Sequence, residues 1–127
     1  MPGSDSRPFF LNLIKIRLPV TGVISIFHRI SGVILFLAIP WFIYLFEMSL
    51  RGEREFNQVM LDLQQFWVKL FLIILLWSIV HHFYAGLRFL CTDFDLGLSK
   101  QQSRLTAWLV ILLELVTFVM IMYGICV

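Results

Sequence analysis

Three long runs of apolar residues, separated by two polar connectors, dominate the chain. No Asp, Glu, Lys or Arg occurs in residues 30–46 or 70–87, and only Glu114 interrupts the last run. An apolar helix of about 20 residues crosses the ~30 Å hydrocarbon core of a bilayer. The pattern therefore predicts an all-α integral membrane protein with three transmembrane helices, over about residues 22–47, 66–90 and 105–127.

The remaining segments are interpreted as an N-terminal segment and two polar connectors. Residues 1–21 mix charged and apolar positions, and Leu13–Leu18 suits either a short extended segment or one at the membrane interface. The connectors cover residues 47–65 and Thr92–Arg104. Pro40 is expected to kink the first helix without ending it, because a membrane helix tolerates proline.

Composition supports the membrane interpretation and excludes other classes. Hydrophobic residues make up 60% of the 127 residues and charged residues 14%, against about 45–50% and 25% in soluble proteins. A net charge of +2 is too small to indicate nucleic-acid binding. Cys91 and Cys126 form no C-x-x-C motif, so neither a disulfide framework nor a cysteine metal site is expected. We expect a single domain, 1–127, whose first helix serves as a retained insertion signal.

Lysine and arginine are distributed unequally between the two ends of the predicted helices. One side would carry Arg7, Lys15, Arg17, Arg29, Arg88, Lys100 and Arg104, and the other Arg51, Arg54 and Lys69. The richer side is normally cytoplasmic. This predicts that the N-terminal segment is cytoplasmic, that the C-terminus is external, and that Arg29 and His82 lie on the same side of the membrane.

Two adjacent histidines near the end of the second run are the first candidate site. Successive helical residues differ by ~100°, so His81 and His82 face different directions. His82 has Ser78 and Gly86 four residues away on either side, and such small residues permit close approach of a helix or a flat cofactor. His81 shares its stripe with Trp77, which suits a lipid or interface position. His82 is therefore predicted to be the buried, working imidazole, used for metal ligation, proton relay or a polar contact between helices.

A second polar cluster begins the first helix. Ser25, Arg29 and Gly32 share a helical face, and His28 is adjacent to it. A hydroxyl and a guanidinium facing a cavity could hydrogen-bond a carbonyl oxygen or hold an anion. The alternative, which the residues alone favour, is that Arg29 is a basic anchor reaching lipid headgroups.

The two clusters together carry a family resemblance. The motif S-x-x-H-R-x-S-G in Ser25–Gly32, followed by H-x-x-x-G-x-R-x-x-x-x-D in His82–Asp93, resembles the cytochrome b subunit of succinate dehydrogenase, respiratory complex II. The resemblance extends over nearly the whole chain, including Arg7-Pro8 and the R-x-P of Arg17–Pro19. Each motif alone is moderately specific, and the ordered pair on one membrane face is more specific.

The resemblance implies a role for each matching residue. His82 would be an axial ligand of haem b, and the second ligand would come from a partner anchor subunit. Ser25 and Arg29 would line the ubiquinone site, while His28 and Arg29 would lie near the haem propionates. Asp93 matches the family aspartate after the second helix.

It also implies the protein's place in a larger assembly. The three helices would form part of a helical bundle with the second anchor, and the chain would pass electrons from an iron–sulfur subunit to ubiquinone. A flavoprotein subunit would oxidise succinate, so this chain alone would hold no catalytic residue. The bacterial inner membrane is expected in preference to the mitochondrial one.

Two features depart from the family pattern, and two other functions stay open. His81 precedes the ligand position, so a shift of one residue would make His81 the ligand. Glu114 is deep in the third helix, where it would pair with a cation or be protonated. The alternatives are a haem-free structural anchor of a fumarate reductase-type complex, or a proton-relaying transporter subunit.

Overall fold

The computed structural model describes residues 18–126, except for the side chain of Cys126, and this part of the chain is all helical. The elements are α1 (Val20–Leu50), α2 (Glu53–Leu63), α3 (Phe66–Asp93) and α4 (Lys100–Cys126). Three of them, α1, α3 and α4, are long and apolar enough to cross a membrane. The predicted all-α fold with three transmembrane helices is therefore confirmed. Residues 13–17 of the predicted extended or interfacial segment lie outside the described residues.

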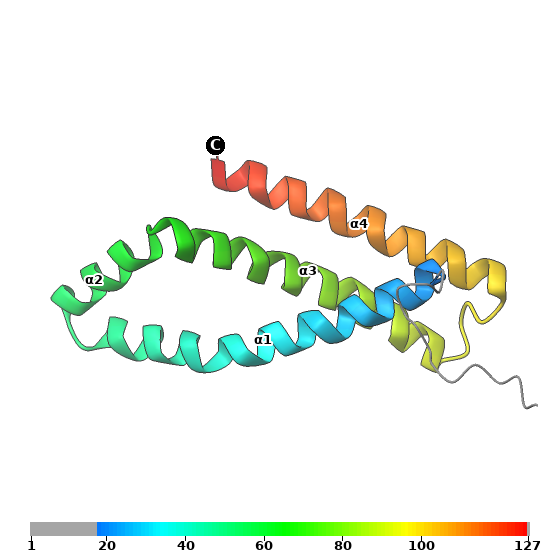
Figure 1. The fold of residues 1–127 in the computed structure, drawn as a ribbon, viewed down its shortest axis with the longest axis horizontal. Helices are drawn as coiled ribbons and strands as arrows, with labels where there is room; N and C mark the ends of the chain where they lie inside the picture. Colours follow the sequence, from blue (N-terminus) through cyan, green and yellow to red (C-terminus); the bar gives the residue numbers. More distant parts are fainter. Residues whose placement is uncertain (1–17, 127) are drawn as a thin grey trace, which may run out of the picture.

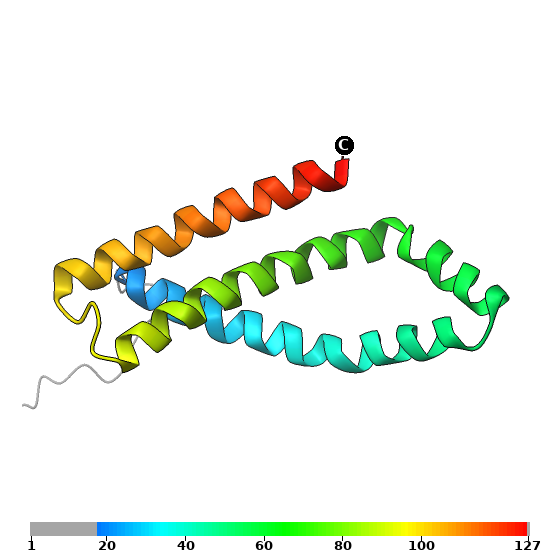
Figure 2. The ribbon, with the colours of Figure 1, turned by 180° about the vertical axis from the view of Figure 1, so that it is seen from behind.

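The helices converge at one end of the molecule. α1 and α3 run antiparallel, α2 closes the loop between them, and α4 returns along α3 (Figures 1 and 2). The start of α1, the end of α3 and the start of α4 thus lie together. α1 continues through Pro40 as one helix and is bowed along its length (Figure 1), as expected where a proline removes one backbone hydrogen bond.

The buried core lies where the three long helices converge. Its fully buried members are Ile24 of α1, Ala85 of α3, and Ala107 and Val110 of α4. Ala85 and Ala107 have no exposed surface at all. Side chains this small let helix backbones approach closely, which is the usual way that helices pack in lipid. Most large apolar side chains outside this core are exposed on the single chain, available to lipid or to a partner helix.

The polar connector predicted over residues 47–65 contains a helix, α2, that was not predicted from the sequence. Phe56, Val59, Met60 and Leu63 repeat at the i, i+3, i+4, i+7 spacing of an amphipathic helix, and α2 buries Val59. Its first turn carries acidic side chains, which suit a helix N-terminus.

Candidate functional site

The two predicted polar clusters meet in the structure. The imidazole rings of His28 on α1 and His82 on α3 are stacked, with centroids 4.1 Å apart and an interplanar angle of 10°. Phe89 contacts the His28 ring edge-on at 5.1 Å. The start of α1 and His82 therefore lie at the same end of the helices, as the prediction of Arg29 and His82 on one membrane side requires.

The Nδ1 atom of His82 is held by α1. It lies 3.2 Å from the backbone carbonyl oxygen of His28 and 3.2 Å from Ser31 Oγ. Ser31 is fully buried, and its hydroxyl donates to the same carbonyl at 2.8 Å. A carbonyl oxygen can only accept, so this contact is a hydrogen bond in the tautomer with the proton on Nδ1, and in that neutral tautomer Nε2 keeps its lone pair. Ser31 belongs to the quoted motif, but no role for it was inferred from the sequence.

Two glycines make room for this stack. A Cβ atom at Gly32 would lie 3.1 Å from His82 Cε1, and one at Gly86 would lie 3.4 Å from His28 Nε2. Each ring therefore occupies the space that a side chain on the facing helix would fill. The predicted small-residue stripe around His82 is confirmed here, and Ser78 on that stripe is fully buried.

The other predicted residues are half-buried or exposed. On α1, Ser25 is half-buried and Arg29, one helical turn later, is exposed. Asp93 ends α3 and is also exposed. The donors of Ser25 and Arg29 are therefore on the side of α1 that a further subunit or a small molecule can reach.

The predicted lipid or interface position of His81 is wrong. His81 is buried, with 3% of its surface exposed, whereas His82 is half-buried. The reason is Ala85, on the same stripe as His81, which lets α4 pack closely over that face. The bulk of Trp77 was given too much weight, since its ring stacks beside His81 at 5.2 Å without keeping α4 away.

His81 instead binds Glu114 across the α3–α4 interface. Its Nδ1 lies 2.9 Å from Glu114 Oε2, and both side chains are largely shielded. The Nε2 atom of His81 is buried without a hydrogen-bond partner among the described residues, and the imidazole ring contacts the rings of Phe27 and Trp77. Glu114 was expected to pair with a cation or be protonated, and its partner is this imidazole.

Comparison with known proteins agrees with the geometry. Residues 4–121 match the model of the family described as succinate dehydrogenase/fumarate reductase transmembrane subunit. The chain is 33% identical over 115 residues to the succinate dehydrogenase cytochrome b556 subunit of Coxiella burnetii, covering 90% of this chain and 92% of that one.

Two further relatives are similar over most of their length. The cytochrome b560 subunit of Reclinomonas americana succinate dehydrogenase is 32% identical over 84% of this chain and 77% of its own. The cytochrome b556 subunit of Rickettsia bellii succinate dehydrogenase is 29% identical over 85% of this chain and 84% of its own. The chain therefore belongs to the succinate dehydrogenase/fumarate reductase transmembrane subunit family, as one of its membrane cytochrome b subunits.

Proposed function

We propose that this chain is an anchor subunit of succinate:ubiquinone oxidoreductase that binds haem b jointly with a second anchor. In this proposal His82 is an axial ligand of the haem iron, and Ser25 and Arg29 form part of the ubiquinone-reduction site. The relative from Coxiella burnetii is named a cytochrome b556 subunit, and a b-type cytochrome carries haem.

The observation that carries the proposal is the state of the His82 ring. Metal-bound histidine usually donates its other ring N–H to a carbonyl or carboxylate, which fixes the tautomer and raises the basicity of the ligating nitrogen. His82 Nδ1 meets the His28 carbonyl in this way. Nε2 is therefore the nitrogen suited to bind iron, and the residues present fit a haem.

The same test disfavours His81 as the ligand. Its Nδ1 is bound to Glu114 on α4, and its Nε2 is buried. The ring also contacts Phe27 on α1 and Trp77 on α3, so an iron atom could reach His81 only if these neighbours moved. His82 lies at the half-exposed edge of the α1–α3 pair, where a second anchor could supply the other ligand.

The residues around His82 suit the remainder of the group. Haem b with two histidine ligands carries electrons and leaves no open coordination position. In this proposal His28 and Arg29 would neutralise its propionates by charge-assisted hydrogen bonds. Ser25 and Arg29 can donate to a quinone carbonyl, whose negative charge increases on reduction, and such donors favour the reduced form.

In this proposal the other steps of the reaction belong to partner subunits. Succinate oxidation would belong to a flavoprotein subunit, and an iron–sulfur subunit would deliver electrons to the converged end of the helices. We place that end in the cytoplasm of a bacterium, with the chain spanning the inner membrane, because most of the basic residues are on that side.

Two other functions predict different observations. A haem-free anchor would need no imidazole with one ring nitrogen against a backbone carbonyl, so the contact of His82 Nδ1 with the His28 carbonyl supports the haem proposal over this alternative. A proton relay would need a continuous series of hydrogen-bonding groups, but among the described residues the His81–Glu114 pair ends at the unpartnered Nε2 atom of His81.

The test is the absorption spectrum of the purified, dithionite-reduced complex. His82→Ala should remove or shift the b-type alpha band, because one axial ligand is lost. His81→Ala, which alters the adjacent imidazole, is the matched control and should retain the band. If the band survives in the His82 variant but disappears in the His81 variant, the iron ligand is His81 and not His82. If the complex with the unmodified protein contains no haem, the proposal fails and the haem-free structural anchor is the remaining function.

A further inference from the structure

Arg88 is a buried cation without an anionic partner in the described part of the chain. Only 8% of its surface is exposed. The carboxylates of Asp93 and Asp95, further along the same helix end and turn, form no ion pair with it, and the ion pairs present among residues 18–126 involve other groups. A charge shielded from water requires compensation, and no carboxylate among residues 18–126 forms an ion pair with this guanidinium.

The guanidinium is held rigidly, with donors to spare. Nε donates to Thr106 Oγ1 at 3.2 Å, and Nη2 donates to Ser103 Oγ at 3.0 Å and to the Ser103 carbonyl at 3.4 Å. Arginine has five N–H donors, so the contacts to α4 leave Nη1 available. A planar group fixed in this manner is well suited to bind phosphate oxygens.

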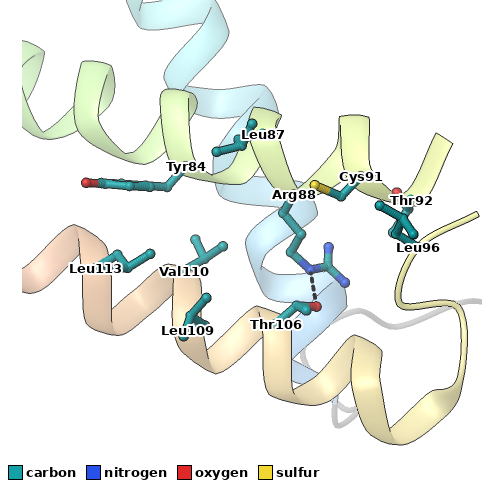
Figure 3. A pocket seen from close by; sticks show the side chains of 10 residues that line it. All are labelled: Tyr84, Leu87, Arg88, Cys91, Thr92, Leu96, Thr106, Leu109, Val110 and Leu113. Carbon is teal, nitrogen blue, oxygen red and sulfur yellow. Dashed lines mark hydrogen bonds between the residues drawn. The ribbon is translucent and has the colours of Figure 1, made fainter. Parts of the chain in front are cut away.

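An apolar cavity of about 150 Å³ adjoins the guanidinium between α3 and α4. Tyr84 and Leu113 line its deeper end, while Cys91, Thr92 and Leu96 line the end near the turn, with Arg88 between them (Figure 3). Arg88 lies five residues before the end of α3, ~7.5 Å along the axis. The cavity therefore begins at headgroup depth and continues towards the hydrocarbon core.

This cavity is separate from the proposed haem site. Cys91 follows His82 by nine residues, and at ~100° per residue the two side chains leave α3 on opposite faces. The cavity is also too small for a macrocycle, since ~150 Å³ of apolar space holds a benzene-sized group. Its largely apolar lining fits the upper part of an acyl chain.

We propose that Arg88 and this cavity bind one phospholipid with an anionic headgroup. Arg88 holds the lipid phosphate, and the first methylenes of an acyl chain lie against Leu87, Leu109 and Leu113. Arg88 has no anionic partner among residues 18–126, so its charge favours a headgroup with net negative charge over a zwitterionic one. The lipid thereby bridges α3 and α4 at the end of the helices where the site lies.

Cys91 offers a natural reporter because it lines the cavity and its side chain is exposed. The complex is stripped of lipid in detergent, and the rate of maleimide labelling at Cys91 is followed by peptide mass spectrometry, which separates it from Cys126. Phosphatidylglycerol or phosphatidylcholine is then added. At ten times its dissociation constant, phosphatidylglycerol should slow labelling about tenfold, because only about one site in ten stays open. Phosphatidylcholine should have little effect.

Two variants locate the effect. Arg88→Gln should lose the protection by phosphatidylglycerol, whereas Arg54→Gln, which removes an arginine from α2 at the far end, should keep it. If Arg88→Gln does not assemble, Leu109→Trp fills the cavity with Arg88 intact, and should reduce the phosphatidylglycerol retained per complex in native mass spectrometry. Equal protection by both lipids would overturn the proposal. So would full protection of Cys91 after lipid removal, since a partner subunit would then cover the cavity.

Discussion

His81 Nδ1 on α3 lies 2.9 Å from Glu114 Oε2 on α4, and this contact joins two of the three helices that are long and apolar enough to cross a membrane. Glu114 follows Arg104 by ten residues, ~15 Å along α4, close to the middle of a ~30 Å core. The two side chains are 4% and 12% exposed. An unpaired polar group in lipid is costly, so each side chain lowers the free-energy cost of burying the other.

This relationship predicts a strongly non-additive pair of substitutions. Glu114→Leu leaves both His81 nitrogens without a partner, and His81→Leu leaves a buried carboxyl unpaired. Each single change should destabilise the complex by about 1–3 kcal/mol, while the double change to leucine should cost less than the sum, because both polar groups are gone. The measurement is thermal denaturation of the purified complex.

The Tyr84–Thr117 hydrogen bond, at 2.8 Å across the same helices, provides the control. Combining Tyr84→Phe with Glu114→Leu should give costs closer to additive, since the two contacts share no atom. An additive His81/Glu114 double variant would show that the contact has no coupling energy.

A second prediction concerns the close approach at Gly32. Alanine normally stabilises a helix by about 0.8–1.0 kcal/mol over glycine. At Gly32 the added Cβ would be 3.1 Å from His82 Cε1, so the ring must move. We expect Gly32→Ala to shift the reduced haem band or lower haem occupancy. Gly124→Ala, where nothing lies within 4 Å, should leave the spectrum unchanged. Identical spectra for both variants would mean that His82 tolerates the movement.

The helices could be predicted from the sequence because lipid imposes one strong requirement. A run such as residues 70–87 must satisfy its backbone internally, so its period of apolar residues hardly matters. For α2 the spacing of the apolar residues does matter. This helix has an amphipathic repeat within a polar stretch, and a search for long apolar runs overlooks it.

Burial was harder to predict than helical structure. Choosing between His81 and His82 required knowing which stripe faces α4, and both stripes contain small residues: Ala85 on one, Ser78 and Gly86 on the other. Spacing within α3 gives directions around its axis but not the position of a neighbouring helix. The partner of Glu114 was missed for the same reason, because residues 33 positions apart meet only once the α3–α4 packing is known.

The third prediction concerns topology. The basic residues place the converged ends of the helices on the cytoplasmic side. A reporter fused after Val127 should therefore be external, and one inserted between Asp95 and Lys100 should be cytoplasmic. Protease protection in inverted vesicles provides an independent reading. If both reporters are found on one side, α4 does not cross the bilayer.

The fourth prediction separates quinone chemistry from assembly. Ser25 and Arg29 are one helical turn apart on α1, so both can reach one small group. Ser25→Ala removes a neutral hydrogen bond, worth about 0.5–1.5 kcal/mol. Arg29→Ala removes a charge-assisted donor and should cost more, on the order of 1.5–3 kcal/mol. Both variants should lose succinate-dependent ubiquinone reduction, with the larger loss for Arg29.

Electron transfer from succinate to a soluble dye that accepts upstream should survive in both variants, because the centres that feed this dye belong to other subunits. That activity, measured on membranes, also verifies that the complex has assembled. The exposure of Arg29 makes the result decisive, since an exposed arginine is easily replaced unless it binds a ligand or a partner. An assembled Arg29→Ala complex that reduces ubiquinone at the normal rate and apparent affinity would leave Arg29 as a headgroup anchor and would remove it from the quinone site.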